Sequence, residues 1–190
     1  LAVEVPREGA SVQGRARAAR YAALLDHANR LSATLAVGHT LDDQAETVLA
    51  RLLRGAGLQG LAGIEPARAD RVVRPLIDCR REEILAHVAR FELPTVEDPS
   101  NADPRFLRSR IRHQLLPALR DEDPNVALHL ARLADEARDI GALLDSSALT
   151  AGEELEGLPR PVRLRAMALW IERLTGQKAK RALERRARFP

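Results

Sequence analysis

The stretch His39-Thr40-Leu41-Asp42-Asp43-Gln44-Ala45-Glu46-Thr47 decides how the rest of the chain is organised. It follows Leu35-Ala36-Val37, an apolar run typical of a buried strand, and Gly38, where the backbone can turn sharply. Thr40 can cap a new helix, with Asp43 as the acidic partner of a capping box. The pattern predicts that these polar side chains lie where a strand ends and a helix begins. Open α/β sheets bind their ligands in that crevice.

The acidic residues of this stretch have two interpretations. Acids in the first turn of a helix interact favourably with its positive end, which would explain two of them. Three acids, at Asp42, Asp43 and Glu46, together with His39 are denser than capping requires. Asp43 and Glu46 are three residues apart and share a helical face, so they could hold Mg²⁺ or an ammonium group. The spacing does not choose between those ligands.

Further blocks of charged and polar residues follow in a specific order. They are Arg51-Leu52-Leu53-Arg54-Gly55, Arg74-Pro75-Leu76, Glu97-Asp98-Pro99-Ser100-Asn101 and Arg108-Ser109-Arg110-Ile111-Arg112-His113. Together with the first stretch, they resemble the PP-loop ATPases that modify tRNA, and within that group the tRNA(Ile)-lysidine synthetase family. The resemblance extends from Gly9 to Leu119.

This resemblance implies both a fold and a reaction. The fold is α/β, with a parallel sheet flanked by helices (adenine nucleotide alpha hydrolase-like, Rossmann-like). The reaction is the ATP-dependent ligation of lysine to C2 of the wobble cytidine of tRNA(Ile) with a CAU anticodon, through an adenylated tRNA intermediate. ATP, Mg²⁺, free lysine and tRNA(Ile) are the implied cofactors and partners. The oligomeric state is left open, a homodimer included.

The resemblance also implies roles for individual residues. Asp43 and Glu46 position lysine, and Asp43 also binds the metal. His39 accepts a proton, and Arg112 binds phosphate. The implied substrate-binding residues are Arg20, which precedes Tyr21 in an Arg-Tyr pair similar to that of the family, together with Asp42, Arg105 and Arg108.

Helical periodicity gives independent support for part of this set. Over 106–119 the apolar residues Leu107, Ile111 and Leu115 form a stripe, and three arginines, Arg105, Arg108 and Arg112, line up beside it. A solvated edge next to a buried stripe would also produce this pattern. Guanidinium groups in a row of one sign suit the phosphates of ATP and RNA, and we favour that interpretation.

One motif of the family is absent from the chain. Its ATP-binding loop, Ser-Gly-Gly-x-Asp-Ser, does not occur, and no Gly-x-x-x-x-Gly-Lys-Ser/Thr loop replaces it. The chain also begins at Leu1 without a methionine. We therefore expect a fragment that lacks its N-terminal ATP-binding portion, and the ATP-binding residues stay unassigned.

Composition narrows the remaining function classes. Only Lys178 and Lys180 are lysines among the 30 basic residues, and the formal charge is +3. The single cysteine, Cys79, excludes disulfides and cysteine-ligated clusters within this chain. No apolar run reaches transmembrane length, so we expect a cytoplasmic protein. A tRNA 2-thiolation enzyme of the same superfamily and a non-catalytic RNA-binding module remain as alternatives.

The rest of the chain predicts three segments. Residues 1–120 form the C-terminal part of a PP-loop catalytic domain, in which a strand at 72–76 and a helix at 80–91 continue the strand–helix alternation. The glycine-rich stretch 55–64 is interpreted as a flexible connector. Residues 121–176 are an all-helical extension, and 177–190 are a basic tail.

Overall fold

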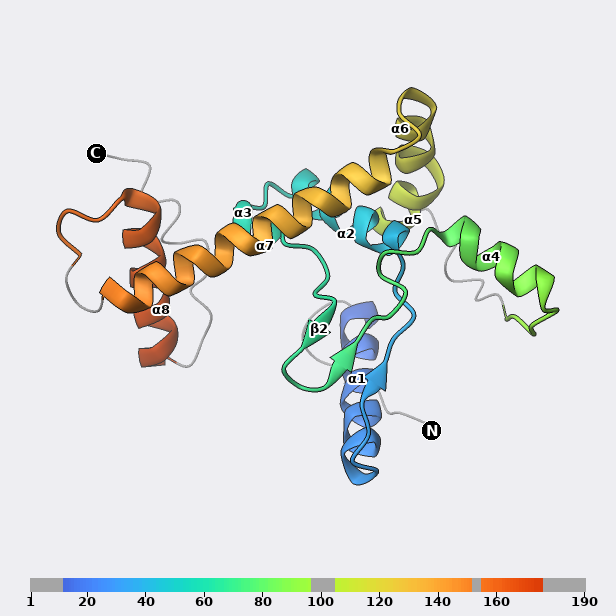
Figure 1. Cartoon of the computed structure of the whole chain (residues 1–190), viewed down its shortest axis with the longest axis horizontal. Helices are drawn as coiled ribbons and strands as arrows, with labels where there is room; N and C mark the ends of the chain where they lie inside the picture. Colours follow the sequence, from blue (N-terminus) through green and yellow to red (C-terminus); the bar gives the residue numbers. More distant parts are fainter. Residues whose placement is uncertain (1–11, 97–104, 152–154, 176–190) are drawn as a thin grey trace. The chain divides into compact units, whose positions relative to one another are not determined.

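The structure, a computed structural model, describes residues 12–96, 105–151 and 155–175 (Figure 1). The sequence block at 97–101 and the predicted basic tail at 177–190 lie outside these residues. The described residues fall into two compact units. The first holds residues up to Ala50 and those from Gly63 to Ala131, and the second holds Arg51–Ala62 and the residues from Arg132 onward.

The sheet of the first unit consists of three two-residue strands, β1 (Leu35–Ala36), β2 (Ala67–Arg68) and β3 (Val72–Val73), in the order β1-β3-β2. The strands β1 and β3 are parallel, as predicted. The strands β2 and β3 are antiparallel, so the sheet is mixed rather than wholly parallel. The strand β2 was not predicted, because two polar-flanked residues carry no strand pattern. The run at 35–37 is also less buried than we expected, since Ala36 is exposed.

Helices make up most of the described chain. Those that lie wholly in the first unit are α1 (Val12–Arg30), α4 (Arg81–Arg90), α5 (Leu107–Arg110), the π-helical turn η2 (Ile111–Leu115) and α6 (Leu116–Glu122). The helix α2 (Leu41–Leu53) begins in the first unit, and so does α7 (Val126–Ala151). The predicted helix at 80–91 is therefore confirmed to within one residue at each end. Among the described residues, no helix is both long and apolar enough to cross a membrane.

The core of the first unit joins α2 to the helices that follow the sheet. Its buried residues are Leu41, Ala45, Leu116, Ala127 and Ala131, with Val126 and Leu130 packed against them. The first turn of α2 is therefore fixed by apolar packing on one side. Its polar side chains occupy the other side, where they meet α5 and η2.

The helix predicted at 106–119 contains a π turn that changes which residues are buried. The N–H of Leu116 bonds the carbonyl of Ile111, five residues earlier. Ile111 and Leu116 are buried, whereas Leu115, which we expected in the apolar stripe, is 41% exposed. Pro117 explains the change, because it has no N–H to donate and its ring would clash with a carbonyl four residues earlier.

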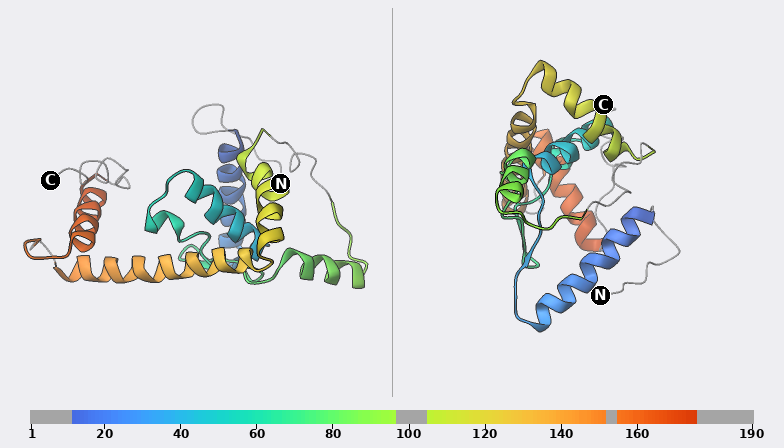
Figure 2. Two further views of the ribbon diagram at one scale, coloured as in Figure 1. Left: turned by 90° about the horizontal axis from the view of Figure 1, so that it is seen from above. Right: turned by 90° about the vertical axis from the view of Figure 1, so that its right-hand side faces the viewer.

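The second unit contains α3 (Leu58–Leu61), most of α7 and α8 (Arg160–Thr175). Figure 2 shows α7 as one unbroken helix, and its sequence includes Gly141. The guanidinium group of Arg165 on α8 binds both carboxylate oxygens of Asp145 on α7. The short helix α3 lies in the glycine-rich stretch, and the interpretation of this stretch as a flexible connector stays a prediction.

Candidate functional site

The site begins at the first turn of α2, which the capping box fixes. The backbone N–H of Thr40 donates to Oδ2 of Asp43 at 2.9 Å, and the N–H of Asp43 donates to Oγ1 of Thr40 at 3.3 Å. The Thr40 hydroxyl adds a third bond to Oδ2, at 3.1 Å. The predicted capping box is therefore confirmed. It uses one oxygen of Asp43 and leaves Oδ1 pointing toward α5 and η2.

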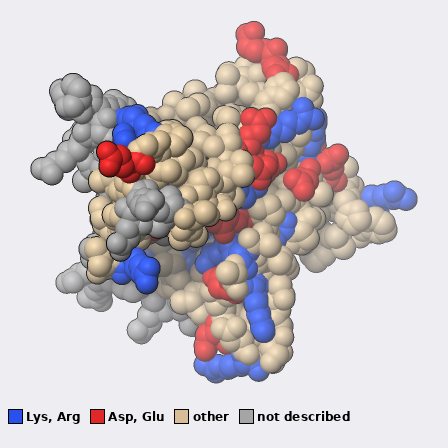
Figure 3. Space-filling view, turned by 60° about the vertical axis from the view of Figure 1, so that its left-hand side comes forward, with Lys and Arg blue, Asp and Glu red and all other residues tan. Residues whose placement is uncertain are grey.

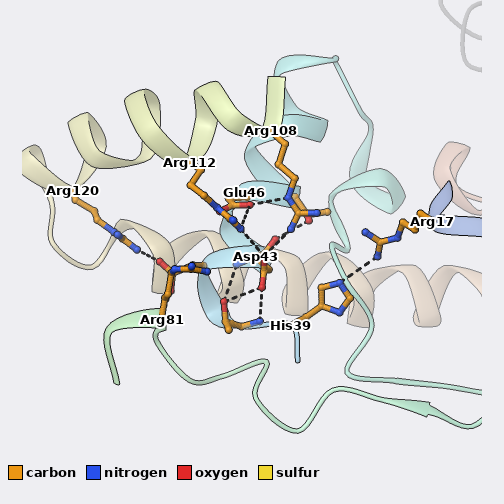
Figure 4. Close-up of polar contacts among 11 residues, drawn as sticks. Arg17, His39, Asp43, Glu46, Arg81, Arg108, Arg112 and Arg120 are labelled. Carbon is orange, nitrogen blue, oxygen red and sulfur yellow. Dashed lines mark hydrogen bonds and ion pairs between the residues drawn. The ribbon is translucent and has the colours of Figure 1, made fainter. Parts of the chain in front are cut away.

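Two arginines converge on the face that Asp43 shares with Glu46 (Figure 4). Arg112 places Nε 2.5 Å from Oε1 of Glu46 and Nη2 3.0 Å from both Oε2 of Glu46 and Oδ1 of Asp43. Arg108 places Nε 2.9 Å from Oε2 of Glu46 and Nη2 2.7 Å from Oδ1 of Asp43. Both guanidinium groups therefore bridge the same two carboxylates. These contacts bring together four of the residues that the sequence singled out.

The burial of these groups is uneven. The side chain of Glu46 is 1% exposed and that of Asp43 13%, whereas Arg112 is 22% and Arg108 45% exposed. Burial alone would raise the pKa of Asp43, but the Thr40 N–H and the two guanidinium groups outweigh it and lower that pKa below its usual value. Burial opposes the charge of Arg112, yet its bond to Glu46 and the nearby acids raise its pKa. Asp43 and Arg112 are therefore both ionised at neutral pH.

Asp42 faces a different set of partners. It is buried, its Oδ2 accepts the backbone N–H of Arg81 at 2.7 Å, and its Oδ1 forms an ion pair with Arg120. Because Arg81 is the first residue of α4, this carboxylate satisfies an N–H that a helix leaves without an internal partner. Asp42 therefore connects α2 with α4 and α6. The substrate-binding role predicted for it stays a prediction.

His39 lies at the opening of α2, and Figure 4 shows its ring next to Arg17. Arg74 Nε donates to Nδ1 of His39 at 3.2 Å, and Nη2 of Arg17 lies 3.3 Å from Nε2. Burial, together with the charges of Arg17, Arg74 and Arg108, lowers the pKa of His39 to about 4 against the opposing effect of Asp43. His39 is therefore neutral at neutral pH.

Two predicted substrate-binding residues lie outside this cluster. Arg20 is on an exposed part of α1 and makes no hydrogen bond or ion pair with the described residues of the site. Arg105 is exposed as well, and its carbonyl accepts a bond from Arg110 at 3.2 Å. Their roles stay predictions.

Sequence reasoning missed Arg17, Arg74 and Arg120 as members of the site. A signal for Arg74 was present. Because β1 and β3 are parallel, with Ala36 opposite Val73, the residues that follow both strands meet at one edge of the sheet. His39 follows the first strand and Arg74 follows the second. Arg17 and Arg120 are members of amphipathic helices, and no pattern distinguishes them from solvated arginines.

Opposite charges also lie next to one another on the face of the protein shown in Figure 3. In Figure 3, acidic and basic side chains alternate on the face shown rather than forming a field of one sign. The modest net charge of +3 is consistent with this distribution. Recognition of a polyanion by this face would rely on local arginines and not on a broad positive potential.

The site fits cations with N–H donors better than it fits Mg²⁺. Both oxygens of Asp43 and both of Glu46 accept bonds from protein donors. Among the described residues, no group of three or more His, Cys, Asp or Glu side chains could hold a metal ion. A metal would have to displace a guanidinium group, so the metal role of Asp43 stays a prediction.

A helix that begins directly after a parallel strand, as α2 does after β1, is typical of proteins that bind nucleotides or phosphate. The sequence profile of the PP-loop domain matches residues 1–119, more than half of the chain, so the chain belongs to the PP-loop family. This confirms the family-level prediction. The family implies the use of ATP.

Within that class, the chain is similar to proteins named tRNA(Ile)-lysidine synthase. It is 40% identical to that of Pseudomonas fluorescens over 189 residues, which are 88% of this chain and 42% of the relative. It is 39% identical to that of Salinispora arenicola over 191 residues, 92% of this chain and 57% of the relative. It is 45% identical to that of Methylobacterium nodulans over 165 residues, which are 85% of this chain and 47% of the relative. The chain thus spans about half the length of these relatives.

Proposed function

We propose that the protein containing this chain ligates lysine to C2 of the wobble cytidine of tRNA(Ile) with a CAU anticodon, at the expense of ATP. One observation carries the proposal. Asp43 and Glu46, on the helix that opens the site, accept five N–H bonds from two arginines within a PP-loop domain. The names of the curated relatives supply the substrate.

The proposed reaction has two steps. The C2 carbonyl oxygen of cytidine attacks the α-phosphorus of ATP, so that an O-adenylate forms and pyrophosphate leaves. The ε-amine of lysine then attacks C2, the bond between C2 and the adenylate oxygen breaks, and AMP departs while the amine loses its proton. Mg²⁺, when bound with ATP, would neutralise phosphate charge. The chain's own residues would bind and orient the amine and the phosphates.

The carboxylate pair is suited to an ammonium group. Asp43 and Glu46 bind donors at 2.5–3.0 Å, the range of charge-assisted hydrogen bonds. The ε-ammonium group of lysine carries three N–H donors and one charge, as a replacement for a guanidinium requires. Arg108 is the more exposed of the two arginines, so we propose that lysine takes its place.

The same two arginines offer donors to phosphate. No bond among the described residues uses Nη1 of Arg108 or Arg112, while Nε and Nη2 of both are bound to the carboxylates. An Arg108 released by lysine would have its whole guanidinium group available. Arg112 would stay on Glu46 and keep the carboxylates oriented.

His39 is a weak candidate for the base. A group with a pKa of about 4 holds a proton poorly at neutral pH, and a general base works best near the operating pH. Its proposed role as proton acceptor is therefore less well supported than the roles of the carboxylates. The neutral ring is better suited to donating a hydrogen bond.

The test is incorporation of labelled lysine into tRNA(Ile) with a CAU anticodon, by the complete gene product with ATP and Mg²⁺. We expect incorporation at the wobble cytidine, and a loss of at least about 100-fold in Asp43→Asn, as for other residues that orient a reacting group. Asp70→Asn, which removes a surface acid paired with Arg68 within the described part of the chain, is the matched control and should retain activity. Lysine-independent modification with a sulfur donor, or salt-sensitive tRNA binding without ligation, would contradict the proposal.

A further inference from the structure

Arg74 is a buried cation without an acidic partner among the described residues. Its side chain lies at the end of β3 and the residue is 5% exposed. Its hydrogen bonds go to Nδ1 of His39 and, through Nη1, to the backbone carbonyl of Glu65, both of which are uncharged. Burying an unpaired charge is costly, and proteins normally pair it with an opposite charge. An anion bound beside Arg74 would compensate its buried charge.

The hydrogen bonds of His39 indicate which nitrogen carries its proton. Neutral imidazole has one donor and one acceptor nitrogen. Arg74 has only donors, so its bond to Nδ1 makes Nδ1 the acceptor and leaves the hydrogen on Nε2. The opposite tautomer would set two donors against each other at buried Arg74. The Nε2–H of His39 therefore points toward Arg17.

This tautomer creates a second mismatch that a ligand would resolve. Nη2 of Arg17 is 3.3 Å from Nε2, and both atoms carry hydrogens. Two donors that face each other do not form a hydrogen bond, but they can bind one oxygen atom together. Arg17 is exposed, and its guanidinium carbon lies 5.4 Å from the centre of the Tyr21 ring, a cation–π contact.

The neighbouring charges favour an anion. The positive charges of Arg17, Arg74 and Arg108 all lower the pKa of His39, whereas the negative charge of Asp43 raises it. The carboxylate of Asp43 is already bonded to Thr40, Arg108 and Arg112. Arg68 adds another guanidinium group near Tyr21, at 5.9 Å from the ring centre, and pairs with Asp70.

We propose that Arg17 and the Nε2–H of His39, supported from behind by Arg74, form a binding site for a terminal phosphate group, such as that of pyrophosphate or of a small phosphoester. A terminal phosphate carries up to two charges and three acceptor oxygens, so it can accept from both donors and also compensate Arg74. A phosphodiester of RNA carries a single charge. This site is separate from the carboxylate pair and does not depend on the proposed ligation.

Binding of inorganic pyrophosphate to the full chain tests the site directly by calorimetry. Loss of one charge-assisted hydrogen bond should weaken binding about tenfold or more, so we expect that loss in Arg17→Gln and in His39→Ala. Arg30→Gln removes the same charge from the same helix α1, at a residue paired with Asp26, and should bind within about twofold of the unmodified protein, a difference of less than 0.5 kcal/mol. Equal weakening in Arg17→Gln and Arg30→Gln would overturn the proposal, because it would show a diffuse charge effect.

A second measurement does not depend on affinity. In ¹⁵N-histidine-labelled protein, we expect the His39 signals to show a hydrogen on Nε2 and to shift on addition of pyrophosphate, with no such shift in Arg17→Gln. A hydrogen on Nδ1 would overturn the assignment. So would binding of a short oligoribonucleotide without end phosphates at this site in preference to pyrophosphate. Neither measurement involves lysine incorporation. A negative result for pyrophosphate binding therefore does not contradict the proposed ligation, and a negative ligation assay does not contradict the phosphate site.

Discussion

Nε of Arg112 lies 2.5 Å from Oε1 of Glu46, although 66 residues separate them in the chain. The contact joins η2 to α2 across the site, and Arg108 makes a parallel contact from α5. The carboxylates are buried more deeply than the arginines that neutralise them. The ion-pair network thus stabilises the fold and also favours the ionised form of Asp43 next to partly exposed cations.

Removing the carboxylate of Glu46 should destabilise the protein. Glu46→Ala leaves Arg108 and Arg112 without their main partner and creates a cavity, so we expect a loss of about 2–4 kcal/mol in the free energy of unfolding, a range discounted because the arginines are partly exposed. Denaturant unfolding measures it. Glu82→Ala, at a side chain 77% exposed, should change stability by less than about 0.5 kcal/mol. Equal effects in the two variants would contradict the network's role.

Asp43 should make stability depend on pH in the acid range. Its pKa in the folded protein is lowered from the usual 3.8, so the folded state favours the ionised form. The stabilisation is complete above that usual value and is lost as the pH falls below it, through the folded-state pKa. Comparing unfolding free energies of the unmodified protein and Asp43→Asn from pH 6 to pH 3 should show a steeper acid loss in the unmodified protein. Parallel curves would contradict this.

The titration of His39 should respond to its neighbours in opposite directions. We expect a pKa of about 4 by NMR, raised in Arg17→Gln because a cation is removed and lowered in Asp43→Asn because an anion is removed. The unfolded state binds the proton more readily, so His39 lowers stability progressively as the pH falls from about 6.5 toward 4. A pKa near 6.5 in the folded protein would contradict the buried, arginine-flanked position.

Much of this site was predictable because local rules govern it. The capping box of Thr40 and Asp43 follows from three-residue spacing, and the shared face of Asp43 and Glu46 follows from helical periodicity. The partners of Asp42 and His39 depend on which helices pack together, which no short pattern specifies. The strand β2 was missed because its two residues gain their conformation from pairing with β3 and not from their own propensity.

The π turn should be visible in a pair of neighbouring leucines. Leu116 is 2% exposed within the core and Leu115 is 41% exposed, the reverse of what an uninterrupted α-helix predicts. We expect Leu116→Ala to cost about 2–5 kcal/mol and Leu115→Ala less than about 1 kcal/mol. Thermal or denaturant unfolding compares them under identical conditions. A larger cost at Leu115 would show that the regular helical register holds in solution.

Gly63 should be intolerant of any side chain because of Gln44. The amide of Gln44 accepts the N–H of Ile64 at 2.6 Å and donates to its carbonyl at 3.1 Å, which fastens the chain after the glycine-rich stretch to α2. A Cβ on Gly63 would lie 2.5 Å from Oε1 of Gln44, and its backbone φ of +63° disfavours other residues.

We therefore expect Gly63→Ala to lower the free energy of unfolding by about 1–3 kcal/mol, the range for strained backbone and a lost buried hydrogen bond. Gly141→Ala is the matched control, since a Cβ there meets nothing within 4 Å and lies inside α7. It should stabilise the protein by about 0.5–1 kcal/mol through helix propensity. Denaturant unfolding of both variants gives the sign and size of each change. If Gly63→Ala were as harmless as Gly141→Ala, the Gln44 bridge would not hold this segment in solution.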